Sequence, residues 1–518
     1  MKMVKSLFLG SAAGLVAMTG AQAADLPVKA KPVQYVKICS LYGAGFYYIP
    51  GTDMCLKIDG YVREQVGWNV NGNLTQGALI GNLDTRSTSN FANRARGYIT
   101  ADARNQTEYG TVRSYIAVGV SGNPDPASGA SNTFSANRAF IQFAGFTFGI
   151  TQSFYDFHAT PAYSFWGGLI NPSSDSGDGG KQVTAYTMQF GNGLSSTISA
   201  EGQRNKGVLG PTLSSGTVTT GAAPANMTPI SIPGSSQKGV NFPDIVANLR
   251  LDAAWGGAQI MGAIHDASGG YYPAATGTLV GAQANGTTAN GNPADALGWV
   301  IGAGLKLNTP MFGAGDNFSA QVNYTQGALG YLNNSDTVLY SKFNNSNGTY
   351  GYGLMSDSVY GVTPGSIQLT TAWGVNAAYE HFWSKSWQTS VYGGYQAYSY
   401  NATANAALCS APGAGAGQGQ VGYGYGLIAG ATGVCNNNFN TWNIGSRIQW
   451  NVDANTAMGL DIVYQRLETA SAGATFTPAL FATTTSGATV GSNSNAVRTV
   501  ANQDAIMAQF RIHRNFYP

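Results

Sequence analysis

The chain has little charge and few of the residues that build metal or catalytic centres. Charged residues are 10% of its 518 positions, against about 25% in soluble domains. It has four histidines and four cysteines, with no Cys-x-x-Cys or Cys/His cluster, so a zinc site is not expected. After residue 23 no stretch approaches about 18 uninterrupted apolar residues, so no transmembrane helix is expected. Any residence in a membrane must therefore be as a barrel of strands.

The first residues have the pattern of a secretory signal peptide. Lys2 and Lys5 precede an uncharged stretch at 6–17, and Ala21-Gln22-Ala23 fits small-x-small cleavage. The alternative is a membrane anchor, but the apolar run is too short to span a bilayer. We predict a signal peptide at 1–23, an N-terminal segment with a disulfide loop at 24–54, and a transmembrane β-barrel at 55–518.

Charge balance and cysteine count give two further expectations. The chain has 26 lysines and arginines and 24 aspartates and glutamates. Removal of Lys2 and Lys5 with the predicted signal peptide would leave equal numbers of both, and a net charge near zero. That balance gives no indication of a nucleic-acid partner. An even number of cysteines in an exported chain suggests disulfides. We predict the local pairing, Cys39 with Cys55 and Cys409 with Cys435.

Glycine and period-2 patterning are abundant, and together they predict about sixteen strands. Glycine accounts for 70 residues, about twice the usual share. The connections between the strands alternate in length. The long ones are 69–89, 121–135, 153–180, 205–239, 266–293, 327–368, 401–439 and 468–499. The short ones are 106–110, 144–145, 191–193, 255–256, 309–316, 382–385 and 451–454. Short turns at one end and long loops at the other are typical of an outer-membrane barrel.

The strands divide into an apolar and a polar face. In 441–450, for example, Trp442, Ile444, Ile448 and Trp450 share one face, while Asn443, Arg447 and Gln449 share the other. The strands at 245–254, 318–325, 456–465 and 504–516 alternate in the same way. The two tryptophans are eight residues apart, about 26 Å along a strand, which nearly spans the apolar band between two aromatic girdles. The alternative is a soluble sheet, whose polar face would carry many lysines and glutamates.

Two charged residues depart from this alternation. Arg514 falls on the lipid side, but it is close enough to the chain end to reach the headgroups. Glu64 also falls on the lipid side, within the strand at 55–68. It lies either at a contact between subunits or at a bulge, and the sequence does not distinguish these.

Several segments resemble the general porins of alphaproteobacteria. They are Tyr35-Val36-Lys37-Ile38-Cys39, 42–52, 55–63, 102–110, 138–149 and 151–157. The resemblance covers 35–160 strongly, the closing strand moderately and the variable loops hardly at all. It implies a sixteen-stranded trimeric barrel with an inward-folded third loop. Members of that family usually end on the final phenylalanine, whereas this chain adds Tyr517 and Pro518 after Phe516.

The predicted fold is therefore all-β. It is a closed antiparallel transmembrane barrel of about sixteen strands, with short periplasmic turns, long extracellular loops and the third loop folded into the lumen. A diffusion pore needs wall charges that orient solutes and filter ions. The predicted pore-lining residues are Arg63, Arg94, Arg96, Arg104, Arg113 and Arg138. The alternative is that they are merely solvated wall residues.

The third long connection is expected to supply the opposing charges. Asp156, Asp175 and Asp178 lie in 154–180, a segment dense in aromatic residues. An exposed loop would not be expected to carry so many rings, whereas a loop packed inside the barrel would. Carboxylates on this loop facing arginines on the wall would set up a transverse field. An ordinary outward loop is the alternative.

No catalytic arrangement is found in the sequence. Residues 417–422 fit G-x-G-x-x-G, but no strand–helix–strand context surrounds them. We predict no enzyme and no cofactor. The predicted function is passive diffusion of small hydrophilic solutes and ions through a water-filled channel in the bacterial outer membrane. Expected partners are outer-membrane lipid, lipopolysaccharide and two further copies in a homotrimer. A substrate-selective channel on the same barrel is one alternative, and an exported non-channel protein such as an adhesin is another.

Overall fold

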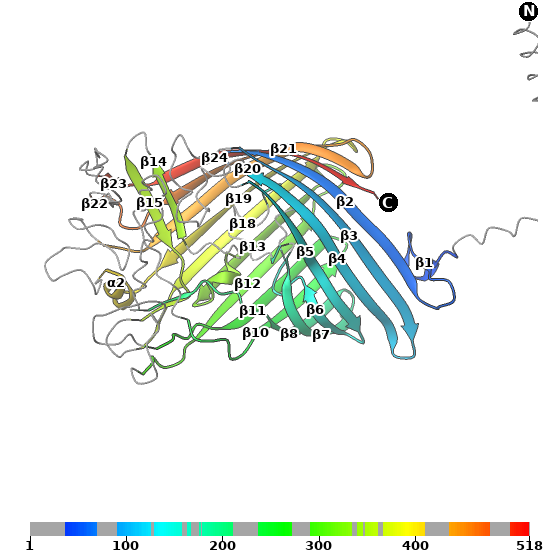
Figure 1. The fold of residues 1–518 in the computed structure, drawn as a ribbon, viewed down its shortest axis with the longest axis horizontal. Coiled ribbons are helices and arrows are strands. Elements are labelled where there is room, and N and C mark those ends of the chain that lie inside the picture. Colours follow the sequence, from blue (N-terminus) through cyan, green and yellow to red (C-terminus); the bar gives the residue numbers. More distant parts are fainter. Residues whose placement is uncertain are drawn as a thin grey trace, which may run out of the picture.

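Sixteen antiparallel strands form one barrel (Figure 1). The computed structural model describes residues 37–69, 91–125, 129–157, 163–166, 176–177, 179–210, 237–271, 291–333, 339–344, 348–360, 366–409, 435–476 and 498–516. The barrel strands are β2 (Cys55–Trp68), β3 (Phe91–Thr107), β4 (Gly110–Asp125), β5 (Gly129–Phe143), β6 (Phe146–Thr151), β7 (Lys181–Gly191), β8 (Leu194–Glu201), β10 (Asp244–Ala253), β11 (Gly256–Asp266), β12 (Leu297–Asn308), β13 (Asn317–Gln326), β18 (Thr371–Phe382), β19 (Trp387–Ser399), β20 (Phe439–Asn451), β21 (Thr456–Glu468) and β24 (Gln503–Asn515).

The barrel is closed by its first and last strands. β2 pairs with β3 on one side and with β24 on the other, in an unbroken register from Tyr61↔Asn515 to Trp68↔Ala508. Every barrel strand is therefore hydrogen-bonded to a strand on each side, so the sheet has no edge strand. The predicted all-β closed barrel is confirmed.

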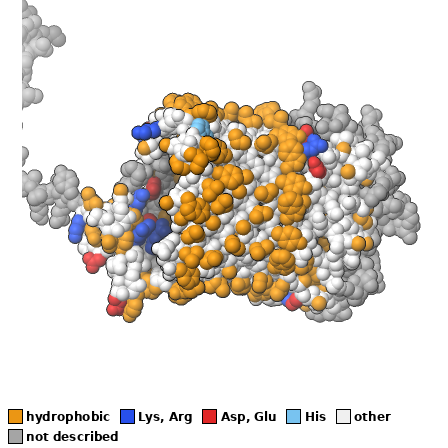
Figure 2. Space-filling view, turned by 180° about the vertical axis from the view of Figure 1, so that it is seen from behind, with side chains coloured by type: hydrophobic (Ala, Val, Ile, Leu, Met, Phe, Trp, Pro, Cys, Tyr) orange, Lys and Arg blue, Asp and Glu red, His pale blue; other side chains and the backbone are white. Residues whose placement is uncertain are grey.

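The two faces of each strand have opposite character, as predicted. On β20, Ile444 is 54% exposed on the outside, whereas Arg447 is 3% exposed on the inside. Figure 2 shows apolar side chains spread over the middle of the outer surface, with charged side chains gathered near its two ends. This is the surface that a barrel crossing a bilayer requires.

Aromatic side chains form a belt at each boundary of the apolar band. Toward the loop end, outward rings on neighbouring strands pair in sequence: Trp299–Tyr324, Trp373–Tyr395 and Trp442–Tyr464, with centroids 5.6, 5.1 and 5.3 Å apart. Near the turn end, Trp387 and Trp450 stack at 6.0 Å. Such rings favour the headgroup boundary because they are apolar with one polar tip. The predicted spacing of Trp442 and Trp450 matches the two belts.

One predicted long connection is wrong. We expected a loop at 121–135, but β4 continues to Asp125 and β5 begins at Gly129, so the ladder runs through most of that segment. Its serines, glycine and asparagines resemble loop composition. Cross-strand pairing, which extends to Asp125↔Gly129, overrides this local preference.

Composition suggested that the remaining long connections are exposed loops, but several of them have buried residues in their described parts. Val208, Leu209, Ala470 and Ala474 lie in two of them and are buried. The connections contain β9 (Val208–Leu209), η5 (Leu329–Tyr331), β14 (Leu339–Asn344), β15 (Thr349–Leu354), β16 (Ser358–Val359), β17 (Gln368–Leu369), α2 (Ala402–Cys409), β22 (Thr475–Phe476) and β23 (Arg498–Val500). Together they build a hydrophobic cluster at the loop end of the barrel. Among the described residues, no helix is long and apolar enough to cross a membrane.

Both predicted disulfides are confirmed. Cys39 bonds Cys55 and ties η1 (Ser40–Tyr42) and β1 (Tyr47–Tyr48) to the start of β2. Cys409 bonds Cys435 and ties the end of α2 to the segment before β20. Residues 1–36 lie outside the described residues, so the signal peptide and the start of the N-terminal segment stay predictions.

The structure decides one of the two readings of Glu64. Glu64 pairs with Ala95 on β3 and Ile512 on β24, and neither ladder shows a register shift there. Glu64 is therefore not at a bulge. It shares the outward face with Val62, which is 59% exposed. Arg514 is also outward, but it lies at the turn end, where its Nη1 donates to Thr456 Oγ1 at 2.7 Å.

We expect the two faces of β20 to respond oppositely to a new charge. Ile448→Lys places an ammonium on the lipid face, two residues from the belt at Trp450, at a cost between about 0–1 kcal/mol at the interface and about 2–4 kcal/mol at the midplane. Gln449→Lys, one residue further on, places the same charge in the lumen and should cost much less. Urea titration of folding into lipid vesicles measures both. Equal destabilisation by the two substitutions would contradict the assignment of faces.

Candidate functional site

The third loop, which we define as residues 152–180 between β6 and β7, starts inside the barrel. The Phe154 carbonyl accepts from Asn248 Nδ2 at 2.6 Å, and the Tyr155 hydroxyl donates to Asn323 Oδ1 at 3.0 Å. Asn248 and Asn323 are inward-facing residues of β10 and β13. Tyr155 is fully buried and its ring contacts Tyr331 of η5. Its burial raises the pKa of its hydroxyl, which therefore stays neutral.

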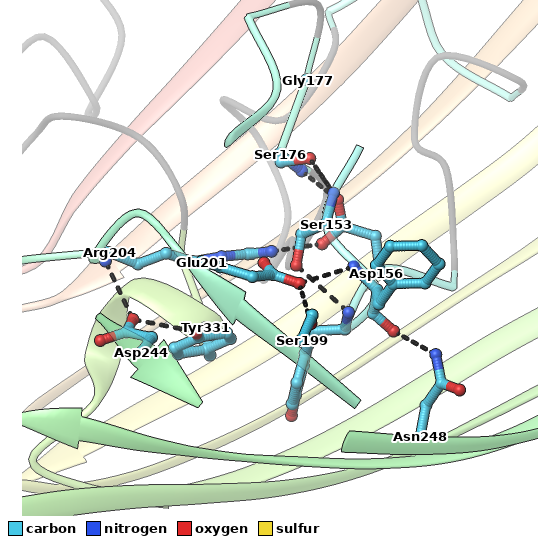
Figure 3. A network of polar contacts seen from close by, with 12 residues as sticks. Ser153, Asp156, Ser176, Gly177, Ser199, Glu201, Arg204, Asp244, Asn248 and Tyr331 are labelled. Atoms are coloured by element: carbon cyan, nitrogen blue, oxygen red, sulfur yellow. Dashed lines mark hydrogen bonds and ion pairs between the residues drawn. The ribbon is translucent and has the colours of Figure 1, made fainter. Parts of the chain in front are cut away.

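Asp156 is the centre of a buried network that joins the two ends of the third loop (Figure 3). Its carboxylate accepts from Arg204 Nη2 at 2.8 Å, and both side chains are 0% exposed. The other carboxylate oxygen accepts from the backbone N–H and the hydroxyl of Ser176, at 2.6 and 2.5 Å. Glu201 accepts from the Phe154 N–H at 2.9 Å. The start of the loop is thereby fixed to its return segment and to the end of β8.

Arg204 holds its charge in this buried place. Its burial opposes the charged form, but attraction from Asp156 outweighs that and raises the pKa of Arg204. Its guanidinium also lies 4.5 Å from the ring centroid of Tyr331, a favourable cation–π contact. The side chain therefore links the third loop to η5.

A second part of the loop reaches strands on the other side of the barrel. The Phe165 N–H and the Ser164 hydroxyl both donate to Asp461 of β21, at 2.6 and 2.9 Å. The Tyr163 hydroxyl donates to Asn317 of β13 at 2.9 Å, and Arg511 of β24 donates to the Phe165 carbonyl. These partners are inward-facing. The described parts of the third loop thus contact the inner wall from β8 round to β24.

Four arginines on three adjacent strands form what we call the basic wall: Arg63 of β2, Arg94 and Arg96 of β3, and Arg511 of β24. Arg63 and Arg96 are direct cross-strand partners, and Gln65 is paired with both Arg94 and Arg511. Like charges directly opposite one another destabilise a sheet. Cross-strand pairing alone therefore does not explain this arrangement.

Five of the six predicted pore-lining arginines fall into two groups. Arg63, Arg94 and Arg96 belong to the basic wall, where Nε of Arg63 donates to His513 Nδ1 at 3.2 Å and Nε of Arg96 donates to Ser121 Oγ at 3.0 Å. Arg104 and Arg113 instead share one carboxylate, Asp102, at 2.7 and 2.9 Å. These two lie near the short turn that joins Thr107 to Gly110, and Asp102 offsets part of their charge.

Arg138 holds the loop rather than standing in the open lumen. Its Nη2 donates to the Gly177 carbonyl at 2.8 Å, and its Nη1 donates to the Asn137 carbonyl at 2.8 Å. Gly180, with φ +60°, lies so close that a Cβ there would be 2.8 Å from Nη1 of Arg138. The return of the third loop is therefore fitted against this side chain.

The expectation for the opposing carboxylates is wrong at one of its three residues. Asp156 lies on the third loop as predicted, but its carboxylate is buried against Arg204 and Ser176 and does not face the wall arginines. Asp175 and Asp178 lie outside the described residues and stay predictions. Among the described residues, no group of three His, Cys, Asp or Glu side chains could hold a metal ion.

Sequence reasoning missed the partners that fix the loop. Arg204 precedes a segment with no strand pattern, and nothing local links it to Asp156, 48 positions away. Alternation places Asp461 and Arg447 on the inner face, but it did not predict that both contact Phe165. The Phe165 N–H donates to Asp461, and the Phe165 ring lies 5.4 Å from the Arg447 guanidinium. A signal was present in β10–β12, where inward Val246, Met261 and Val300 are apolar and buried. Apolar residues on both faces indicate that something covers the inner one.

Fold and site together define a transmembrane β-barrel with a polar, charged lumen and a loop anchored inside it. A family model described as "Porin subfamily" matches residues 25–506, and the chain belongs to that family. This confirms the resemblance to general porins and places the protein in the bacterial outer membrane.

Individual relatives are similar over the better-matched part of the chain. Porin Omp2a of Brucella ovis is 37% identical over 223 residues, covering 38% of this chain and 59% of that protein. Porin Omp2b of Brucella melitensis is 36% identical over 230 residues, covering 40% and 57%. The chain thus spans less than two thirds of the length of these curated relatives. The outer membrane channel DcaP of Acinetobacter baumannii has the same fold, with a TM-score of 0.52, 12% identity, and coverage of 90% and 99%.

We expect Asp156→Asn to release the third loop from the wall. The substitution leaves the buried Arg204 without its counter-charge, and breaking a buried ion pair in this way costs about 3–5 kcal/mol. Limited proteolysis of the folded protein in detergent measures the release, and urea unfolding measures the cost. Asp295→Asn is the matched control, because it removes a carboxylate from an exposed pair with Lys238. Equal protease resistance in the wild type and both variants would contradict the anchoring role.

Proposed function

We propose that the protein is a general diffusion porin, through which small hydrophilic solutes and ions cross the outer membrane passively. The observation that carries this proposal is the lumen itself. Its wall is polar and charged, and an inserted loop is held by a buried ion pair and by hydrogen bonds. Such a loop narrows the passage without closing it. Membership of the porin family favours a channel over an enzyme.

The basic wall supports a preference for anions in the narrow part of the passage. Arg511 is engaged with the Phe165 carbonyl. The guanidinium groups of Arg63, Arg94 and Arg96 raise the local concentration of anions, because low-dielectric walls focus their field. Solutes that pass must keep or replace their hydration, so small polar molecules are favoured over apolar ones. Asp175 and Asp178 remain our candidates for the opposing charge. The apolar outer surface and its aromatic belts support contacts with membrane lipid and lipopolysaccharide.

An alternative, a substrate-selective channel on the same barrel, is favoured by one feature of the lumen wall, a cavity beside the third loop. An adhesin-like role is not supported by any described feature.

We expect Arg94→Ala with Arg96→Ala to shift the permeability ratio toward cations. One unit charge about 4 Å from an ion is worth about 1 kcal/mol in water, roughly fivefold in occupancy. The reversal potential of the purified porin in planar bilayers under a KCl gradient measures the ratio. Arg514→Ala removes the same charge from the outer face at the turn end and should change nothing. An unchanged reversal potential in the double variant would refute the constriction assignment.

We further propose that the protein is a homotrimer with Glu64 at the contact between subunits. Glu64 faces outward between Val62 and Val66, and its paired neighbours Ala95 and Ile512 are apolar. A carboxylate facing hydrocarbon is costly, whereas one at a contact between protein subunits can be paired.

The trimer proposal predicts that Glu64→Leu weakens the assembly while the barrel still folds. Leucine removes the carboxylate that the subunit contact would use. Unheated electrophoresis separates trimer from folded monomer across a temperature series. Val62→Leu, on the same face, is the control. A trimer more heat-resistant in Glu64→Leu than in the wild type would place Glu64 against lipid instead.

A further inference from the structure

A second feature of the lumen lies beside the third loop, on the wall built by β10 to β13 (Figure 1). It is a cavity of about 380 Å³. The strands contribute Arg250, Asp252, Lys306, Asn308 and Ser319, and the third loop contributes Phe157 and Tyr163. The volume is near the low end of the range for small-molecule sites, about 300–1,000 Å³. The cavity therefore fits a small solute.

The cavity is a built feature and not a loose gap. The ring of Phe157 lies against Gly304, where an added Cβ would come within 2.2 Å of it. On the other side Tyr163 is fixed by hydrogen bonds to Asn317 and Ser319. Gly256 and Gly257, which carry no side chains, also line the cavity. Two aromatic side chains are thus held at its border by the same loop that narrows the channel.

Among the described residues that line the cavity, one charged side chain has no charged partner. Asp252 accepts two hydrogen bonds from Arg250, at 2.8 and 3.0 Å, so this pair is neutral together. Lys306 is exposed to the lumen, and its side chain makes no hydrogen bond or ion pair with any described residue. An anion entering the cavity would meet an ammonium group that has no competing carboxylate from the described chain.

We propose that this cavity binds small organic monoanions, namely carboxylates with a flat carbon body, and that solutes pause there beside the third loop. The carboxylate pairs with Lys306, and Asn308 and Arg250 offer further donors. The carbon body lies against the rings of Phe157 and Tyr163. This inference rests on the proposed porin function, since the solute reaches the cavity through the lumen.

The test uses three probes that separate charge from ring. Benzoate carries both, acetate carries the charge alone, and benzyl alcohol carries the ring alone. Calorimetric titration of the purified porin in detergent measures binding, and block of single-channel current in planar bilayers measures binding on the conduction path. We expect benzoate to bind more tightly than either partial probe.

Four variants locate the site. Lys306→Met should weaken benzoate binding by about fivefold, the worth of one nearby unit charge in water. Lys306→Arg should restore it. Phe157→Leu, which keeps apolar volume on Gly304 but removes the ring, should weaken benzoate and leave acetate unchanged. Lys385→Met removes a lysine from the exposed turn between β18 and β19 and should have no effect. Heat-modifiable migration shows whether each variant is folded.

The outcomes separate the two proposals. Benzoate binding that is equally tight in Lys306→Met, or acetate that binds as tightly as benzoate, would overturn the cavity assignment while leaving the porin intact. A purified protein with no stepwise current would overturn the porin function. In that case calorimetry with Lys306→Met still decides whether the cavity binds carboxylates.

Discussion

The pairing of β2 with β24 is the constraint on which the rest of the structure depends. Hydrocarbon offers no partner to a backbone N–H or C=O group, so a sheet can cross a bilayer only if it has no edge. Closure in turn creates an inside, and strand geometry sends alternate side chains to it. The outer face can then be apolar and the inner face polar, in a chain with few charges and no long apolar run. The low charge and spread-out hydrophobicity of the sequence follow from this division.

The inside of the barrel is more than the polar half of an alternating pattern. Where the third loop covers the wall, inward residues such as Met261 and Val300 are apolar and buried, so the barrel has a local core within its lumen. Where the basic wall lies, the inward residues are arginines. One face of one sheet therefore performs two tasks, and the boundary between them is set by the loop. The cavity beside Phe157 lies where loop and wall meet.

The parts of this structure that could be predicted from the sequence are those with a local signal. The strand at 55–68, the faces of β20 and β24 and both disulfides follow from alternation, turn residues and short cysteine spacing. The segment 121–135 was wrongly predicted to be a loop. A loop-like composition indicates a loop only when the segment does not pair with a neighbouring strand, and here β4 and β5 pair through most of it. Asp156 was misread for a related reason. Alternation predicts that a side chain faces the lumen, but it does not predict whether a distant arginine pairs with it there. Arg204 and Asp461 bind the loop from positions far away in the sequence, so no local pattern indicates these contacts.

The anchoring of the loop explains why its central charge pair is buried at all. Burying a carboxylate and a guanidinium costs several kcal/mol for each ion, and their attraction repays that only in good geometry. Asp156 has such geometry, because Arg204 and two donors from Ser176 satisfy it together. The pair favours one position of the loop, since any displacement leaves two buried charges unpaired. Under the proposed porin function, a fixed position of the loop matters more than added stability, because that position determines the space left to a solute. A loop held by apolar contacts alone could shift along the wall, whereas the buried pair of Asp156 and Arg204 favours a single position of the loop.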